Sequence, residues 1–127
     1  MTDKKGGLKL IKAAQLIDGT GSDAIKSGSV LIRDGRILAV GSDQRVVNAH
    51  GSQVEEFTFD RGTIIPGLVD SHVHLNGIGD GRIGDDLAQL PDEVLTLQSA
   101  RNARAHLFSG VTTVRDCGAK NSTTFIN

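Results

Sequence analysis

The 127-residue sequence contains few of the residues that mark nucleic-acid-binding proteins. It has no tryptophan or tyrosine and only four phenylalanines, so it lacks aromatic platforms on which bases could stack. Fourteen basic and fifteen acidic residues give a net charge of −1. This balance removes the electrostatic reason to expect nucleic acid or an anionic membrane as a partner.

Cysteine and long apolar runs are equally scarce. Cys117 is the single cysteine, so no internal disulfide and no Cys-x-x-Cys motif can form. The N-terminal segment is basic, but Lys9, Lys12 and Gln15 interrupt the apolar stretch behind it. No signal-peptide core or membrane span therefore follows. These features predict a cytoplasmic protein, in which Cys117 would be a small buried thiol.

The first 65 residues have the pattern of short β-strands. Residues 29–33 and 36–41 are two β-rich runs joined by Asp34-Gly35, the strongest local signal for a hairpin with a type I′ turn. Residues 42–53 are polar and are predicted to form a loop, in which His50 has no role in a site. We expect antiparallel strands that need a second layer over their apolar face.

A strand is predicted over residues 68–75, and Pro66-Gly67 marks a sharp entry to it. Successive strand side chains point to opposite faces, so Asp70, His72 and His74 would share one face. Same-face neighbours stand about 7 Å apart, so both imidazoles can reach one ion of the zinc type. A bare His-x-His is also compatible with the wet face of an ordinary strand.

The segment after this strand predicts a helix and a second strand. Residues 91–93 (Pro-Asp-Glu) suit a first helical turn, and Gly110 suits the position after the helix end. His106 would be a partly exposed helix residue without a role in a site. Apolar residues recur along the helix as a stripe: Val94, Leu97, Ala100, Ala103, Leu107 and Phe108. Residues 111–115 form the second strand, which a right-handed crossover makes parallel to the first.

The position of the histidine pair favours a metal site over an ordinary strand surface. In parallel α/β folds, ligand sites lie above the carboxyl ends of the strands. His72 and His74 end the first strand, and residues 115–117 (Arg-Asp-Cys) end the second on the same edge. Asp70 would then orient an imidazole or lie below the metal.

The glycine-rich loop after the histidines must be weighed as a nucleotide site. Residues 79–84 spell G-x-G-x-x-G, a pattern that should open a helix whose amide end holds pyrophosphate. Instead, Asp80, Asp85 and Asp86 crowd that position with negative charge, and Pro91 restarts the helix later. We reject nucleotide binding and expect a flexible loop over a site.

Three segments resemble the metal-dependent amidohydrolase superfamily. They are the β segment around residues 34–37 (Asp-Gly-Arg-Ile), the signature from Pro66 to Leu75 with its Asp-Ser-His-Val-His centre, and residues 110–116 (Gly-Val-Thr-Thr-Val-Arg-Asp). The last segment is most similar to the imidazolonepropionase-like and Xaa-Pro dipeptidase-like branches. The resemblance covers roughly residues 8–120.

The resemblance implies an α/β fold and a chemistry. The fold would be the start of a (β/α)₈ TIM barrel, about two strands and one helix over residues 66–127, preceded by part of a small β-sandwich domain over residues 1–65. His72 and His74 would be first-strand ligands of one or two divalent ions, above all Zn²⁺. Metal-activated water would hydrolyse a C–N bond in an amide, lactam or cyclic amide. The partner would be a small-molecule substrate, with no nucleic acid and no membrane, and the complete enzyme could be a homo-oligomer.

The sequence departs from this family in length. Members take further ligands from later strands, namely a carboxylated lysine or a glutamate and two more histidines, with an aspartate as acid/base, and none can be matched in this chain. A barrel typically needs about 250 residues. We expect the amino-terminal portion of a longer enzyme, inactive and poorly stable alone. The alternatives are an Xaa-Pro dipeptidase-type peptide hydrolase and a non-catalytic interaction protein that keeps the fold; the histidine pair favours the enzyme.

Overall fold

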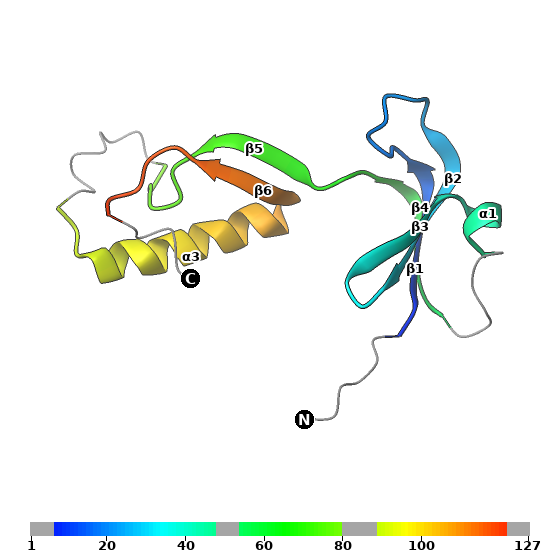
Figure 1. Cartoon of the computed structure of the whole chain (residues 1–127), viewed down its shortest axis with the longest axis horizontal. Coiled ribbons are helices and arrows are strands. Elements are labelled where there is room, and N and C mark those ends of the chain that lie inside the picture. The colour runs from blue at the N-terminus through cyan, green and yellow to red at the C-terminus, as the bar shows by residue number, and fades with distance from the viewer. Residues whose placement is uncertain (1–6, 48–53, 80–88, 122–127) are drawn as a thin grey trace. The chain divides into compact units, whose positions relative to one another are not determined.

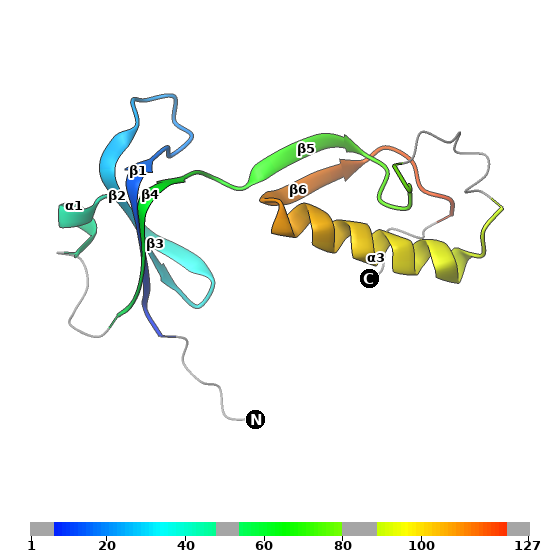
Figure 2. The ribbon, with the colours of Figure 1, turned by 180° about the vertical axis from the view of Figure 1, so that it is seen from behind.

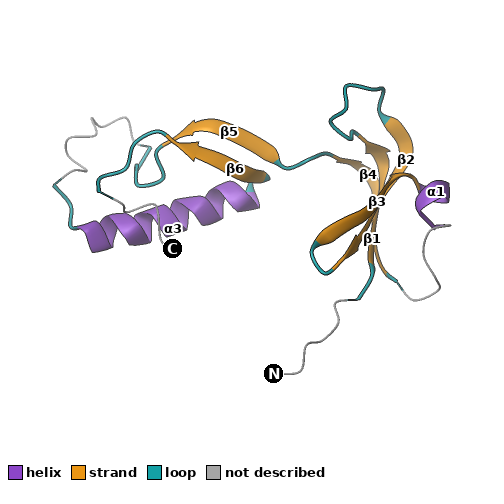
Figure 3. Ribbon diagram, viewed as in Figure 1, coloured by secondary structure: helices purple, strands orange, loops and turns teal. Residues whose placement is uncertain are grey.

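The chain is a mixed α/β protein that divides into two compact units, Met1–Pro66 and Gly67–Asn127. The computed structural model describes residues 7–47, 54–79 and 89–121 (Figure 1). Among these residues, the first unit contains strands and one short helix, and the second contains two strands and a long helix (Figure 3). Within the described ranges, neither helix is long and apolar enough to cross a membrane.

The first unit is built on a four-stranded sheet with the order β3-β2-β1-β4. The strands are β1 (Lys9–Leu16), β2 (Ile25–Arg33), β3 (Arg36–Ser42) and β4 (Glu55–Ile64). β2 pairs antiparallel with β1 and with β3, whereas β4 pairs parallel with β1. The prediction of antiparallel strands throughout is therefore wrong for β4. β4 therefore starts beside the start of β1, with Glu55 opposite Lys9.

The predicted hairpin between β2 and β3 is confirmed. Arg33 pairs with Arg36, which leaves Asp34 and Gly35 as the two-residue turn. Their φ angles are 52° and 72°. Positive φ at both central positions is the condition for a type I′ turn, which matches the right-handed twist of the strands.

The predicted loop over residues 42–53 is wrong in its first part, where α1 (Asp43–Val47) forms a short helix. The one buried apolar side chain described in this helix, Val46, explains it: Val46 forms a core cluster with Leu10 and Leu31. Burial of this side chain stabilises a turn that local polarity does not predict. His50 lies outside the described residues.

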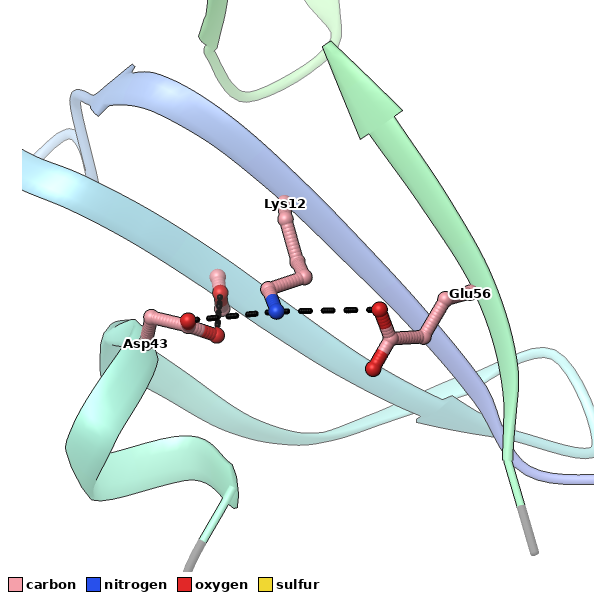
Figure 4. Close-up of polar contacts among 4 residues, drawn as sticks. Lys12, Asp43 and Glu56 are labelled. Atoms are coloured by element: carbon pink, nitrogen blue, oxygen red, sulfur yellow. Dashed lines mark hydrogen bonds and ion pairs between the residues drawn. The ribbon is translucent and has the colours of Figure 1, made fainter. Parts of the chain in front are cut away.

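A charged cluster also connects α1 to the sheet. Lys12 of β1 lies between two carboxylates, 3.2 Å from Asp43 Oδ2 and 3.6 Å from Glu56 Oε2 (Figure 4). The buried hydroxyl of Ser29 donates to Asp43 Oδ1 at 2.9 Å. The hydrogen bond to Asp43 raises the pKa of Lys12 above its ordinary value, outweighing the partial desolvation of the ammonium.

The second unit contains the predicted parallel pair with its connecting helix. β5 (Leu68–Val73) and β6 (Val111–Asp116) are parallel. The helix α3 (Asp92–Phe108) lies beside the two strands, as the front and back views both show (Figures 1 and 2). Pro91 is the N-cap of α3 rather than its first helical residue. Gly110, with φ of 93°, follows the Ser109 C-cap as predicted.

The apolar stripe predicted for α3 points away from the strands. Leu97 is 74% exposed and Phe108 is 77% exposed, whereas Leu95 is fully buried. The packed face instead carries residues at helical spacing that are partly polar: Leu95, Ser99, Asn102 and His106. The periodicity of apolar residues predicted the wrong face. The packed face of α3 carries polar side chains because the carbonyl oxygens of the loop after β5 need hydrogen-bond donors from the helix.

Candidate metal centre

The ends of β5 and β6 lie side by side, as the sequence predicts. Val73 is the register partner of Asp116, and the N–H of Cys117 donates to the carbonyl of Val73 at 2.9 Å. The segments that follow the two strands therefore leave the sheet at one edge. This is the edge at which parallel α/β folds build ligand sites.

His72 and His74 are brought together at this edge. Their ring centroids are 5.3 Å apart and the ring planes meet at 69°. β5 ends at Val73, so His72 belongs to the strand and His74 is the first residue beyond it. Both residues are exposed. The structure thus places two exposed imidazoles next to each other.

The ring of His74 is fixed by a backbone carbonyl. Its Nδ1 lies 3.1 Å from the carbonyl oxygen of Gly118. A carbonyl only accepts hydrogen bonds, so this contact requires the proton of the neutral ring to be on Nδ1. The lone pair then resides on Nε2, the nitrogen left to bind another group.

Among the described residues, the carboxylate of Asp70 does not bond an imidazole ring, although the sequence predicts that it could orient one. Asp70 Oδ1 accepts a hydrogen bond at 3.1 Å from the backbone N–H of His72, not from its ring. Within the described part of the chain, the His72 ring has no hydrogen-bond partner. Asp70 therefore shapes the backbone that presents His72 and leaves both of its ring nitrogens available.

A complete metal site is not present in residues 7–47, 54–79 and 89–121. No group of three or more His, Cys, Asp or Glu side chains in these ranges is arranged to hold an ion. Cys117 is exposed, so the prediction of a buried thiol is wrong. Its backbone N–H pairs with β5, and its Sγ lies 3.7 Å from the carbonyl oxygens of Ser71 and Arg115. The loop that spells G-x-G-x-x-G lies mostly in residues 80–88, outside the described residues.

Sequence reasoning missed the polar side chains that hold the loop after β5. Asn102 of α3 donates through Nδ2 to the carbonyls of Leu75 and Gly77, both at 2.7 Å, and Gln98 donates to Gly77 at 3.4 Å. Asp116 accepts from the N–H of Leu75. One signal was available: Asn102 is a polar residue on the same helical face as Leu95 and Ser99.

Residues 63–127, just over half of the chain, match the amidohydrolase family. The chain belongs to the amidohydrolase family. The Bacillus subtilis (strain 168) protein described as putative amidohydrolase YtcJ is 34% identical over 83 residues, which is 65% of this chain and 16% of that protein. The match thus spans a small part of this curated amidohydrolase relative.

Solved structures support the same family. An amidohydrolase crystal structure is 32% identical, with a TM-score of 0.70 over 87% of this chain and 25% of that one. A crystal structure of an Xaa-Pro dipeptidase with bound methionine in its active site has a TM-score of 0.65 at 24% identity, over 91% of this chain and 28% of that one. The second likeness shows a shared fold. The amidohydrolase chain spans about a quarter of the length of each.

Proposed function

We propose that this chain is the amino-terminal portion of a metal-dependent amidohydrolase that hydrolyses a C–N bond in an amide, lactam or cyclic amide. The observation that carries the proposal is the pair of exposed imidazoles, 5.3 Å apart, at the carboxyl end of a parallel strand. Family membership supports the reaction class. The single cysteine and the near-neutral charge support a small-molecule substrate and a cytoplasmic location.

His72 and His74 would hold a divalent ion, with Zn²⁺ the best match to neutral imidazole donors. When bound, such an ion activates water and polarises a carbonyl group. The Gly118 carbonyl keeps the proton of His74 on Nδ1 and so leaves Nε2 for the metal. Asp70 fixes the backbone of His72 through its N–H. These residues orient two donors; they do not provide an acid or base.

The proposed site needs further ligands. Catalytic zinc sites usually have three protein ligands and one open position, and the histidine pair supplies two. β5, α3 and β6 form one strand–helix–strand unit, the repeat from which a (β/α)₈ barrel is built. We therefore assign residues 66–127 to the start of such a barrel and residues 1–65 to part of a β-sandwich. The 127 residues alone would not turn over substrate.

A narrower version of the reaction is hydrolysis of Xaa-Pro dipeptides. We keep this version as an alternative because of the likeness to the Xaa-Pro dipeptidase structure; at 24% identity, that likeness concerns the fold. A panel of small amides, lactams and Xaa-Pro dipeptides would separate the two versions in any chain that shows turnover. A non-catalytic protein with this fold would have no need of the histidine pair.

Calorimetric titration of the 127-residue chain with Zn²⁺ tests the metal assignment. We expect one binding event that H72A and H74A each abolish and that H106A leaves unchanged. His106 is the control because its Nδ1 is 3.0 Å from the Asn102 carbonyl, on the face of α3. Binding that survives H72A and H74A would overturn the assignment. If the chain binds stoichiometric zinc and hydrolyses members of the amide panel, the proposal that the site is incomplete is wrong.

A further inference from the structure

Asp116, the last residue of β6, uses its carboxylate to bond two separate loops. Oδ1 accepts the N–H of Gly118 at 3.0 Å, and Oδ2 accepts the N–H of Leu75 at 3.3 Å. Leu75 belongs to the segment after β5 and Gly118 to the segment after β6. One half-buried side chain therefore connects the exits of both strands.

Both bonds of Asp116 converge on His74. Leu75 is the next residue in the chain, so holding its N–H holds the peptide that carries the imidazole. Gly118 is the residue whose carbonyl oxygen lies 3.1 Å from His74 Nδ1. Holding the Gly118 N–H orients that same residue. The carboxylate thus fixes the His74 backbone and the acceptor of the His74 ring together.

The helix holds the same loop from its other side. Asn102 donates to the carbonyl of Leu75 at 2.7 Å. Leu75 is therefore bonded through its N–H to Asp116 and through its carbonyl to Asn102. Its side chain is buried as well. The carbonyl of His74 itself accepts the N–H of Gly77 at 2.8 Å. The peptide between His74 and Leu75 is therefore bonded at both its C=O and its N–H, which leaves little freedom for the ring position.

We propose that Asp116 is a positioning residue that keeps the neutral His74 ring in the Nδ1–H tautomer, with Nε2 directed outward as a donor for metal. The tautomer part of the proposal concerns the metal-free chain, and the metal part rests on the proposed function. Without Asp116, the Gly118 carbonyl turns away and the His74 proton moves to Nε2, where a free histidine prefers it. The nitrogen that faces solvent then no longer has its lone pair available.

The test is the tautomer of His74, read from long-range ¹H–¹⁵N NMR spectra of the metal-free 127-residue chain. The spectra are taken at about pH 8.5, where imidazoles are ordinarily neutral. We expect wild type to show Nδ1–H, D116A to shift the population toward Nε2–H, and D116N, which keeps one acceptor oxygen, to lie between them. D116N also serves if D116A does not fold.

Asp70 provides the matched control. D70A removes a carboxylate that accepts a hydrogen bond from the backbone of His72. Within the described residues, that carboxylate makes no hydrogen bond to the loop that follows His74. It should leave the His74 tautomer unchanged. The inference is overturned if wild-type His74 carries its proton on Nε2, if D116A and D116N leave the tautomer in place, or if D70A moves it equally.

A zinc titration of the same variants separates this inference from the proposed function. Loss of a group that orients a metal-binding histidine typically weakens binding about 10- to 100-fold, and we expect D116A to fall in that range and D70A to bind more tightly than D116A. A tautomer shift in D116A without any His74-dependent zinc binding in wild type would support the positioning role and overturn the metal function. An unshifted tautomer would overturn the positioning role, whatever the zinc affinity.

Discussion

Gly67 lies so close to Thr112 that it has no room for a side chain. A Cβ on Gly67 would lie 2.7 Å from the Cβ of Thr112 and closer still to its Oγ1 and Cγ2. This contact is where the parallel pair begins: the N–H of the next residue, Leu68, donates to the Gly110 carbonyl at 2.9 Å. The glycine that precedes the histidine strand is thus required by packing between strands.

The first prediction is that G67A lowers the free energy of unfolding of the second unit by about 1–3 kcal/mol, the usual range for overpacking. The chain lacks tryptophan, so urea unfolding is followed by the helical far-UV circular dichroism signal, which comes mostly from the 17-residue α3. G7A is the control, since a Cβ on Gly7 would meet nothing within 4 Å. A G67A midpoint equal to that of G7A would contradict the contact.

The second prediction concerns the turn between β2 and β3. Gly35 has φ of 72°, so G35A should destabilise the hairpin by about 1–2 kcal/mol, the penalty of a left-handed conformation for an L-residue with a Cβ. D34N should be nearly neutral, since Asn tolerates that region as well as Asp does. Amide hydrogen exchange of Val30 and Val40, which pair across the hairpin, provides the measurement. Equal exchange rates in G35A and D34N would refute the type I′ turn.

The third prediction is an alkaline loss of stability that depends on Lys12. The hydrogen bond to Asp43 raises the pKa of Lys12, so charged Lys12 contributes to the free energy of unfolding. This stabilisation is complete below about pH 10.5, the ordinary pKa, and is lost as the pH rises through the raised pKa. K12M should remove that part of the pH dependence. Urea unfolding of both proteins across this range tests it, and parallel curves would contradict the shift.

Near neutral pH, D43A should lower the free energy of unfolding more than K12M does. D43A leaves the buried Ser29 hydroxyl without its acceptor, which costs about 1–3 kcal/mol. The partly exposed ion pair that K12M removes is worth about 1 kcal/mol or less. D43N keeps an acceptor oxygen for Ser29 and should fall between them. Urea midpoints of the three variants give the ranking, and a K12M loss larger than that of D43A would reverse it.

A fifth prediction concerns acid stability at the start of α3. A hydrogen bond from Asn121 at 2.7 Å, and then the one from Lys120, lower the pKa of Asp92 below 3.8. The stabilisation is therefore present above that value and is lost as the pH falls through the lowered one. D92N should unfold more readily than wild type at neutral pH, and the difference should shrink in acid. E93Q controls for the helix dipole; an equal effect of E93Q would point to the dipole alone.

Features set by neighbouring residues were predictable from the sequence. The Asp34-Gly35 turn, the start of α3 after Pro91 and its end before Gly110 depend on residues adjacent in the chain. So does the proximity of His72 and His74, which follows from strand alternation. Local conformational preference suffices in these places because no distant segment competes with it.

Apart from the parallel pairing of β5 with β6, features set by contacts between distant segments were not predictable. The Gly118 carbonyl that fixes His74 lies 44 residues later in the chain. β4 adds to β1 in parallel after a crossover, and α3 turns polar Asn102 toward a loop 25 to 27 residues earlier. Each arrangement satisfies backbone groups of one segment with atoms of another, and periodicity within a single segment does not contain that information.

The central claim, that His72 and His74 together bind a divalent ion, is tested most directly by X-ray absorption at the zinc edge of the 127-residue chain loaded with one equivalent of Zn²⁺. We expect two imidazole ligands at about 2.0–2.1 Å, with oxygen donors completing the coordination sphere. Both imidazole ligands should disappear in the H72A–H74A double variant and remain in H106A. A zinc sphere of oxygen alone in wild type, or imidazole ligands that persist in the double variant, would contradict the claim.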